Sequence, residues 1–366
     1  MSNTTHISIP IPQFLSEEEK ELFQQQATYQ VTKPRIKTLK RVFVTHDGLV
    51  MKNGFLVDGC AFNLKPKNDH AFYFPFWKKT IEQFAVCKWG KSLKSIKLKG
   101  PKKYLLIHSP WFNYSFWINS FLPRLIEAEE AGHLQSCKLI VPENWKKIPY
   151  VWESLSCFKV EHEVVPEGTH LFVDRLIMPE TRRSTATFYP PRLQNTRSRL
   201  VTEALKRTVS QKFPRKIYLT RSIRGVRCVK NETEVVHFLE SKGYQSIAFE
   251  KLSFWEQIAL MNGATHFVSM HGAGFANILF MKKNNTAIEF LEHDFAQYNN
   301  PFPFWKMAAA TGVIYNALLC DSDQTDHIKH STYTAKKRMN LVNRTVSVSI
   351  SALTEKLKQI DGASVT

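Results

Sequence analysis

A glycine turn that follows an apolar segment carries the clearest chemical signal in this 366-residue sequence. Residues 265–270 are strand-like, the next residues are His271, Gly272, Ala273 and Gly274, and a helix is expected over residues 275–281. The first N–H groups of a helix lack partners and lie at the positive end of its dipole, so a phosphate fits there. Glycine also lets the backbone approach a ligand closely. Taken alone, such a turn is structural as often as functional.

Two arginines near the end of another expected strand strengthen the case for an anion site. Residues 216–220 read as a strand that runs into Arg221, and Arg227 follows six residues later. In open α/β sheets ligands bind at the carboxyl ends of strands, where Arg221 and His271 would both lie. A guanidinium group binds two oxygens of an anion at once. Arg224, by contrast, reads as an ordinary exposed arginine of a basic protein.

Three acidic residues in this half of the chain have different explanations. Ser253 and Glu256 have the spacing of a helix capping box, which accounts for both. Glu250 is expected to end a strand at the same sheet edge, where a carboxylate could accept hydrogen bonds from a ribose. Glu289 lies in an apolar strand, where an unpaired charge is costly, so we expect it to pair with an arginine or to reach the ligand.

The elements that must position these residues are those of an α/β protein. From about residue 102 onward, short apolar runs alternate with amphipathic stretches, as in βα units with a mostly parallel sheet. Residues 179–199 are rich in Arg, Thr and Pro without an apolar period, which predicts a loop and a domain boundary. We expect an N-terminal domain over residues 1–190, with an irregular, strand-rich start, and a doubly wound domain over residues 191–345. Residues 346–366 contain a last helix that could cross back to the first domain.

The overall charge is strongly positive, at +18, and 43% of residues are hydrophobic. Such an excess attracts anionic partners, among them nucleic acid, anionic lipid, acidic polysaccharide and phosphorylated small molecules. Lysines are dense between Lys78 and Lys103, where a solvated helix face and a binding surface are equally good interpretations. The six cysteines lack zinc spacing, and we find neither a signal peptide nor an 18-residue apolar run. A cytoplasmic protein is expected, with at most peripheral contact to an anionic inner membrane.

The ordered motifs between Lys216 and Tyr315 resemble the C-terminal domain of glycosyltransferase family 61, which includes xylosyltransferases and N-acetylglucosaminyltransferases. They read KIYLTRS, VKNETEV, FEKLSFWEQ and FVSMHGAGFANILFM. The resemblance implies a GT-B architecture, in which two Rossmann-like domains face a cleft, the second holds the nucleotide-sugar donor, and transfer inverts the anomeric carbon. The donor-binding residues that it implies are Arg221, Arg227, Glu250, His271, Gly272, Ala273, Gly274 and Asn277.

In the first domain the match departs from the family pattern. A segment that usually reads N-Y-x-H-W-x-x-D-x-L-P-R-L occupies residues 113–125, with Phe116 in place of the usual His and Ser120 in place of the usual Asp. Those two positions are the family's candidates for acceptor handling and proton removal. The acceptor-binding residues implied by this segment are Asn113, Tyr114, Trp117, Ser120 and Arg124.

This departure leaves three interpretations open. An inverting transfer needs a base close to the acceptor hydroxyl, and His108, at the end of an expected strand, is the first candidate, although a lone histidine there is more often structural. Alternatively, an acceptor that bears a carboxylate or phosphate needs little or no base and suits the positive charge. The third interpretation is a homologue that binds the nucleotide sugar and has lost transfer.

No metal or other cofactor is expected. Asp321, Ser322 and Asp323 spell the D-x-D motif that other glycosyltransferases use for Mn²⁺, but they fall in an expected polar loop. Arg221, Arg227 and the helix N-terminus already neutralise a diphosphate.

The sequence therefore predicts an inverting, metal-independent hexosyl- or pentosyltransferase that uses a nucleotide sugar, with UDP the preferred nucleotide. Its acceptor would be a glycan or glycolipid, as in bacterial capsule or lipopolysaccharide synthesis. The alternative from another class is a basic nucleic-acid-binding protein, although no motif of such proteins is found.

Overall fold

The chain divides into two compact units, each built around its own β-sheet. The computed structural model describes residues 4–61, 81–82, 84–85, 94–182, 184, 186–221, 227–299, 302–322 and 343–363. One unit comprises Met1–Thr4 and Val31–Thr196, and the other comprises Thr5–Gln30 and Arg197–Thr366. Residues 78–80, 83 and 86–93 of the lysine-rich stretch lie outside the described residues, as do Arg224 and Asp323. No helix among the described residues is long and apolar enough to cross a membrane.

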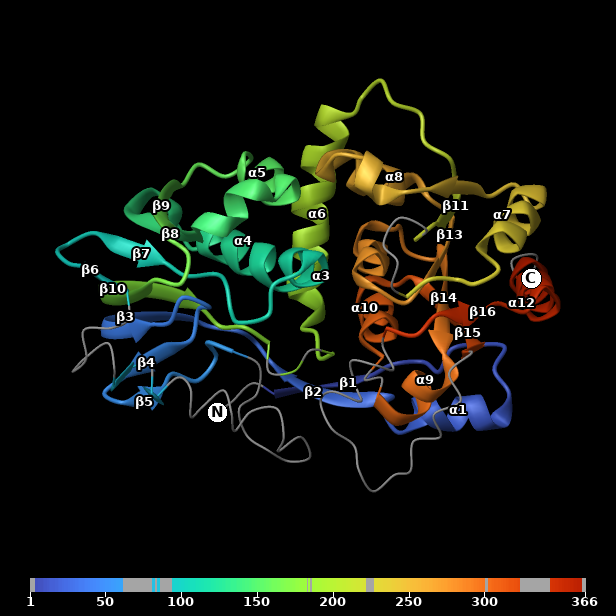
Figure 1. Ribbon diagram of the computed structural model, residues 1–366, viewed down its shortest axis with the longest axis horizontal. Coiled ribbons are helices and arrows are strands. Elements are labelled where there is room, and N and C mark those ends of the chain that lie inside the picture. The colour runs from blue at the N-terminus through green and yellow to red at the C-terminus, as the bar shows by residue number, and fades with distance from the viewer. Residues whose placement is uncertain are drawn as a thin grey trace. The chain divides into compact units, whose positions relative to one another are not determined.

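The first unit contains a mixed sheet (Figure 1). Its strands are β3 Ile36–Val44, β4 Val50–Lys52, β5 Phe55–Leu56, β6 Ser95–Leu98, β7 Lys103–Leu105, β8 Cys137–Pro142, β9 Glu161–Val165 and β10 His170–Pro179. They follow the order β5-β4-β3-β10-β7-β8-β9, with β6 also paired to β10. Strands β10, β7, β8 and β9 are parallel, whereas β3, β4 and β5 form an antiparallel extension. Alternate residues such as Val42 and Val44 point into one core cluster, as the period of a strand requires.

A helical stretch that carries the acceptor motif is interrupted in its middle. Where the sequence predicts a single helix over residues 111–131, the structure has α3 Tyr114–Phe116, a π-helical segment η1 Trp117–Phe121 and α4 Leu122–Glu130. Pro123 has no N–H to donate to the carbonyl of Asn119, and the N–H of Leu122 bonds instead to the carbonyl of Trp117. Helix α5, Pro149–Leu155, follows a short 3-10 turn.

The second unit is a doubly wound sheet, as the sequence predicts. Its strands are β11 Lys216–Leu219, β12 Gln245–Ile247, β13 His266–Met270, β14 Thr286–Glu292, β15 Ile314–Ser322 and β16 Val346–Ser347. The order is β12-β11-β13-β14-β15-β16, in which only β16 is antiparallel to its neighbour. The strand order reverses between β11 and β13, so the carboxyl ends of these two strands form the topological switch point, where such sheets bind ligands.

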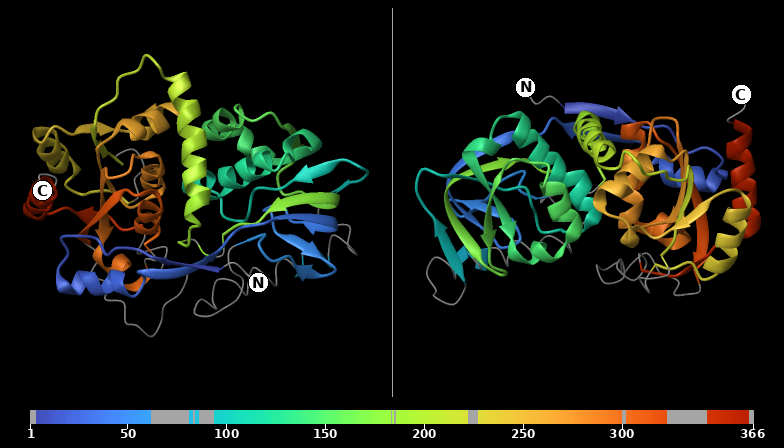
Figure 2. Two further views of the ribbon diagram at one scale, coloured as in Figure 1. Left: turned by 180° about the vertical axis from the view of Figure 1, so that it is seen from behind. Right: turned by 90° about the horizontal axis from the view of Figure 1, so that it is seen from above.

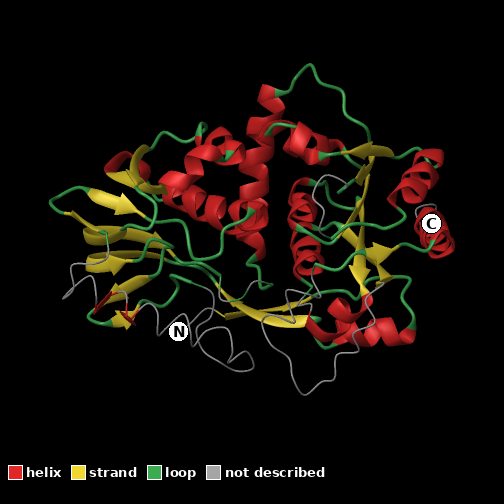
Figure 3. Ribbon diagram, viewed as in Figure 1, coloured by secondary structure: helices red, strands yellow, loops and turns green. Residues whose placement is uncertain are grey.

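Helices cover both faces of this sheet (Figures 1 to 3). They are α7 Glu232–Ser241, α8 Phe254–Gly263, α9 His293–Asn299, α10 Pro303–Thr311 and α12 Ile350–Ala363, with the 3-10 helix η5 Ala273–Phe280. Helices α7 and α12 lie on one face, where Leu239 and Leu353 join a core with Val268 and Phe290. On the other face, α8 and α10 pack against η5.

Three boundaries differ from the sequence-based expectation. Residues 190–207 form one helix, α6 Pro190–Arg207, where a loop to residue 199 was expected, because prolines are tolerated in the first turn of a helix. Helix α12 packs within the second unit through Leu353 and Leu357, not against the first domain. Residues 5–30, expected in the first domain, group with the second unit.

Buried aromatic contacts explain this grouping of the N-terminal segment. The segment contains β1 Thr4–Ser8, α1 Glu17–Gln24 and β2 Thr28–Thr32. Phe23 on α1 is fully buried, and its ring lies 4.1 Å from that of Phe302 and 5.0 Å from that of Trp305. The indole N–H of Trp305 also donates to the carbonyl of Pro10 at 2.9 Å. Since Phe302 directly precedes α10 and Trp305 lies in its first turn, the segment completes the core of the second unit.

Candidate functional site

Arg221 and the glycine turn meet at the carboxyl ends of β11 and β13. The Arg221 guanidinium donates from Nη1 to the carbonyl oxygen of His271 at 2.9 Å. It lies so close to Gly272 that a Cβ atom there would be 1.7 Å from Nη1. A Cβ atom on Gly274 would lie 2.8 Å from a methyl carbon of Leu219. A Cβ atom at either glycine would therefore displace the end of the Arg221 or the Leu219 side chain from its present position.

The turn leads into a 3-10 helix rather than the expected α-helix. The first hydrogen bond of η5 runs from the N–H of Phe275 to the carbonyl of Gly272 at 3.0 Å. The N–H groups that precede it have no acceptor within the helix, which preserves the expected anion-binding geometry around Ala273. Asn277 is buried and donates to the carbonyl of Gly274 at 3.0 Å, so it closes the turn from within.

The backbone of Arg221 is held by a carboxylate that the sequence analysis overlooked. Glu232, at the start of α7, accepts hydrogen bonds at the same oxygen from the N–H of Arg221 at 3.0 Å and from the hydroxyl of Tyr218 at 3.1 Å. Burial, together with this carboxylate, raises the pKa of Tyr218. The only feature of the sequence that could have indicated this role is the position of Glu232, an acidic residue in the first turn of the helix that follows Arg227.

Arg227 adds a second positive charge to this region. Its backbone is left-handed, with φ 56°, and its Nε donates to the side-chain oxygen of Asn343 at 3.1 Å. Burial, and after it the charge of Arg221, lowers the pKa of Arg227 to about 10. The charge of Arg221 thus disfavours the charged form of Arg227, and a bound anion would offset this repulsion.

His271 is held by a buried carboxylate on the neighbouring strand. Its Nδ1 lies 2.5 Å from Oε1 of Glu289, and the hydroxyl of Tyr315 donates to Oε2 of the same carboxylate at 2.6 Å. Glu289 is 1% exposed. The sequence predicted that Glu289 pairs with an arginine or reaches the ligand, whereas the structure pairs it with a histidine and a tyrosine, because residues 289 and 315 are on adjacent strands.

Glu250 is exposed in a short 3-10 helix, Phe249–Lys251, which begins two residues after the last residue of β12. The prediction that Glu250 ends a strand is therefore wrong. The residue nevertheless follows β12, which is the neighbour of β11 in the sheet. The capping box of Ser253 and Glu256 is confirmed at the start of α8.

Asp321 and Ser322, the first two residues of the D-x-D motif, end β15 instead of lying in the expected loop. Asp321 and Ser322 pair with β16, and the Ser322 hydroxyl donates to Glu292 at 3.0 Å. Glu292 also forms a buried ion pair with Arg344 at 2.9 Å, and Asp294 extends this network. Within the described part of the chain, no group of three His, Cys, Asp or Glu side chains could hold a metal ion.

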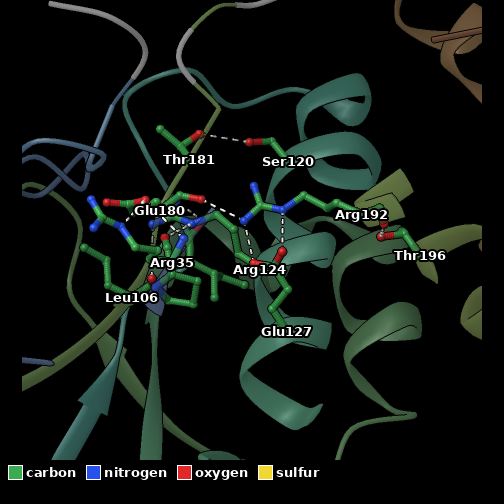
Figure 4. Close-up of polar contacts among 11 residues, drawn as sticks. Arg35, Leu106, Ser120, Arg124, Glu127, Glu180, Thr181, Arg192 and Thr196 are labelled. Carbon is green, nitrogen blue, oxygen red and sulfur yellow. Dashed lines mark hydrogen bonds and ion pairs between the residues drawn. The ribbon is translucent and has the colours of Figure 1, made fainter. Parts of the chain in front are cut away.

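In the first unit, Arg124 is directed at the backbone (Figure 4). Its fully buried guanidinium donates to the carbonyl oxygens of Pro179 at 2.7 Å, Ile107 at 2.5 Å, and Leu106 and His108 at 3.3 Å each. Burial lowers the pKa of Arg124 to about 9. This residue, expected at an acceptor site, thus joins the ends of β7 and β10.

Two further residues of the acceptor motif are buried in structural contacts. The indole N–H of Trp117 donates to the hydroxyl of Ser154 at 2.9 Å, and Trp117 is fully buried. The Ser120 hydroxyl is buried and lies 3.3 Å from that of Thr181.

Asn113 and Tyr114 retain more contact with solvent. Asn113 is exposed, and its side chain caps α3 by accepting from the N–H of Phe116 at 3.0 Å. Tyr114 is half-buried, with its ring 5.1 Å from that of Tyr150.

Arg182 lies beside Phe116, one of the two positions at which this chain departs from the family pattern. Its guanidinium carbon lies 5.4 Å from the ring centre of Phe116 and 4.6 Å from that of Phe188. Nη1 donates to the side-chain oxygen of Asn119 at 2.6 Å. Burial, and after it the charge of Arg192, lowers the pKa of Arg182 to about 9. The sequence analysis missed this cation because it stands in the segment read as a linker.

The environment of His108 disfavours the role of a general base. The side chain is buried against Trp145, with ring centroids 5.4 Å apart, and Nδ1 has no hydrogen-bond partner within the described residues. Burial, reinforced by the charges of Arg124 and His46, lowers the pKa of His108 to about 3. A ring with so low a pKa is a weak base at neutral pH.

Comparison with known families and proteins adds one positive result. A family model described as Glycosyltransferase 61 matches residues 114–288. The matched segment begins at α3 and ends in β14, so it contains Arg221, Arg227 and the glycine turn. The search of curated proteins found no significant match.

Proposed function

Residues 114–288 of this chain are a glycosyltransferase 61 domain, and from this premise we propose that the protein transfers a sugar from a nucleotide-sugar donor to a glycan acceptor. Family membership supports glycosyltransferase activity in general. The finer assignment depends on the second unit, where Arg221 lies against Gly272 at the switch point of a doubly wound sheet. That single relationship carries the proposal, because it provides cationic and N–H donors at the place where such sheets bind diphosphates.

The chemistry that these groups support is displacement at the anomeric carbon. An ionised carboxylate or phosphate oxygen of the acceptor forms the new bond, so no proton has to be removed. The bond from the anomeric carbon to the diphosphate breaks, and the electron pair remains on the diphosphate. Attack from the opposite face inverts the configuration. Arg221, Arg227 and the N–H groups at the start of η5 would stabilise the developing charge, which makes a metal ion unnecessary in this proposal. A GT-B arrangement of the two units belongs to the same proposal.

An acidic acceptor, which needs no base, fits this chain better than a neutral acceptor that His108 would have to deprotonate. The buried, weakly basic ring of His108 favours the interpretation in which the acceptor carries a carboxylate or phosphate. The net charge of +18 also attracts such acceptors. We place the reaction in the cytoplasm of a bacterium, in capsule or lipopolysaccharide synthesis, with UDP as the preferred nucleotide and with contact to anionic membrane limited to the surface.

A homologue that binds the donor without transferring the sugar is the second candidate. The observation that favours it is the replacement of the usual His and Asp by Phe116 and Ser120, together with the burial of Ser120.

Thermal-shift screening of UDP, GDP, CMP and their sugars tests the donor assignment, because a ligand that binds only the folded state raises the melting temperature. A shift with one nucleotide series, and release of the nucleoside diphosphate once an acidic glycan is added, is the expected result. A shift without release across acceptors would favour the silent homologue. No shift at all, with DNA affinity that falls steeply as salt rises, would favour a nucleic-acid-binding protein instead.

A further inference from the structure

The carboxylate of Glu289 lies directly behind the histidine of the glycine turn. One of its oxygens is 2.5 Å from Nδ1 of His271, and the other accepts the hydroxyl proton of Tyr315 at 2.6 Å. Burial of a carboxylate is costly unless its oxygens are hydrogen-bonded, and here both of them are. These contacts explain how a charged residue is stable in the middle of β14.

When Glu289 is ionised, the contact assigns the proton of His271 to Nδ1, because an ionised carboxylate can only accept hydrogen bonds. Nε2 then lies on the other side of the ring. The rings of Phe295 and Phe304, at 4.9 Å and 5.2 Å, flank the imidazole and restrict its rotation. The orientation of the ring is thus determined by groups from β14, β15, α9 and α10.

The same arrangement recurs beneath Arg221. Glu232 accepts from the hydroxyl of Tyr218 and from the backbone of Arg221, just as Glu289 accepts from Tyr315 and from His271. Each of the two strand ends therefore carries a carboxylate and tyrosine pair behind a residue of the anion site.

We propose that Glu289 and Tyr315 are positioning residues of the donor site, which hold His271 so that Nε2 faces a phosphoryl oxygen of the nucleoside diphosphate beside Arg221. This inference rests on the proposed function. A second proton on Nε2 gives an imidazolium that can donate to that oxygen, while the charge of Glu289 balances it. The charged and titratable neighbours are Glu289 from β14, Tyr315 from β15 and Arg221 from the end of β11.

Nitrogen NMR of the full-length protein tests the positioning without any ligand. With ¹⁵N-labelled histidine, and with His271→Asn to assign the signal among the 13 histidines, the wild-type spectrum should show a protonated Nδ1 on His271. In Glu289→Gln the amide can donate to Nδ1, so the proton should shift toward Nε2. A wild-type Nδ1 without a proton, or a Glu289→Gln spectrum with unchanged His271 shifts, would overturn the proposal.

Affinity for UDP provides a second readout. We expect Glu289→Gln to weaken UDP binding by about tenfold or more, because the loss of a charged hydrogen bond leaves His271 misdirected. Tyr315→Phe should weaken it less. The matched control is Glu127→Gln, which removes a partly buried carboxylate of the first unit that pairs with the buried Arg192 at 2.5 Å. That variant should lose stability but keep both the His271 spectrum and the UDP affinity of the wild type.

Two results separate this inference from the proposed function. If Glu289→Gln and Glu127→Gln weaken UDP binding equally, Glu289 acts only through stability, and the positioning role is wrong. If the wild-type protein binds neither UDP nor GDP, the proposed function fails, whereas the NMR experiment still decides whether Glu289 sets the protonation of His271.

Discussion

The guanidinium of Arg221 and the backbone of Gly272 are in direct contact at the carboxyl ends of β11 and β13. A Cβ atom on Gly272 would lie 1.7 Å from Nη1 of Arg221. The backbone of Gly272 is extended, with φ 164°, so any residue could adopt its conformation. Only the missing side chain allows the arginine to lie there, and the position of the charge therefore depends on this glycine.

Substitution of Gly272 by alanine should displace the Arg221 guanidinium. We expect Gly272→Ala to weaken nucleoside diphosphate binding by about tenfold or more, as measured by calorimetry, because a charged hydrogen bond at the site is lost. Gly263→Ala is the matched control, since a Cβ atom at that end of α8 would meet nothing within 4 Å. Equal affinities for the two variants would contradict the role given to Gly272.

Removal of the Arg221 side chain should weaken donor binding more than Gly272→Ala does. In Arg221→Ala, the thermal shift given by the best nucleotide should disappear, since the carrier of the positive charge at the switch point is gone. Ser120→Ala should retain that shift, because Ser120 is buried beside Thr181 in the other unit. A normal shift in Arg221→Ala would remove the basis for a diphosphate site here.

Phe23 should be a stability determinant of the second unit, although it lies near the N-terminus. Phe23→Ala removes a fully buried ring that stacks on Phe302, and we expect a loss of about 3–5 kcal/mol in the free energy of unfolding, measured with urea. Phe55→Ala is the control, because that ring is 73% exposed and its loss should change stability by less than about 0.5 kcal/mol. Similar losses in both variants would show that α1 does not contribute to the core.

Arg124 should contribute to folding rather than to ligand binding. Arg124→Met leaves buried carbonyl oxygens without their donor, which should cost at least about 2 kcal/mol of stability. Nucleotide affinity should stay unchanged. The control is Arg35→Met, since the side chain of Arg35 is 75% exposed and only 3.8 Å from Glu180, a pair worth less than about 1 kcal/mol. If Arg124→Met were as stable as the wild type but transferred sugar poorly, the result would support the original prediction that Arg124 binds the acceptor.

His108 should make the protein less stable as the pH falls. Its folded pKa of about 3 is below the ordinary value of 6.5, so between these values the unfolded chain binds a proton that the folded chain does not. The free energy of unfolding therefore decreases as pH falls from 6.5 toward 3. From pH 7 to pH 5, urea unfolding should show about 2 kcal/mol more loss in the wild type than in His108→Gln. Parallel pH profiles for the two proteins would contradict this expectation.

The local sequence by itself determined the α/β class and the position of the glycine turn that we propose as an anion site. Strand periodicity, the glycine turn after Met270 and the capping box at Ser253 are encoded by neighbouring residues, and the strands and helices of the second unit follow the expected order within a few residues. The meeting of Arg221 with the His271 turn was also predictable, because the carboxyl ends of parallel strands share one edge of a sheet.

Tertiary structure alone decided how the remaining polar residues are used. Whether Glu289 serves a ligand or His271, and whether Arg124 serves an acceptor or the carbonyls of its own sheet, depends on strands that are far apart in the chain. The grouping of residues 5–30 with the second unit likewise depends on contacts such as that of Phe23 with Phe302. Such contacts leave no periodic pattern in the sequence, because they form only when distant segments pack together.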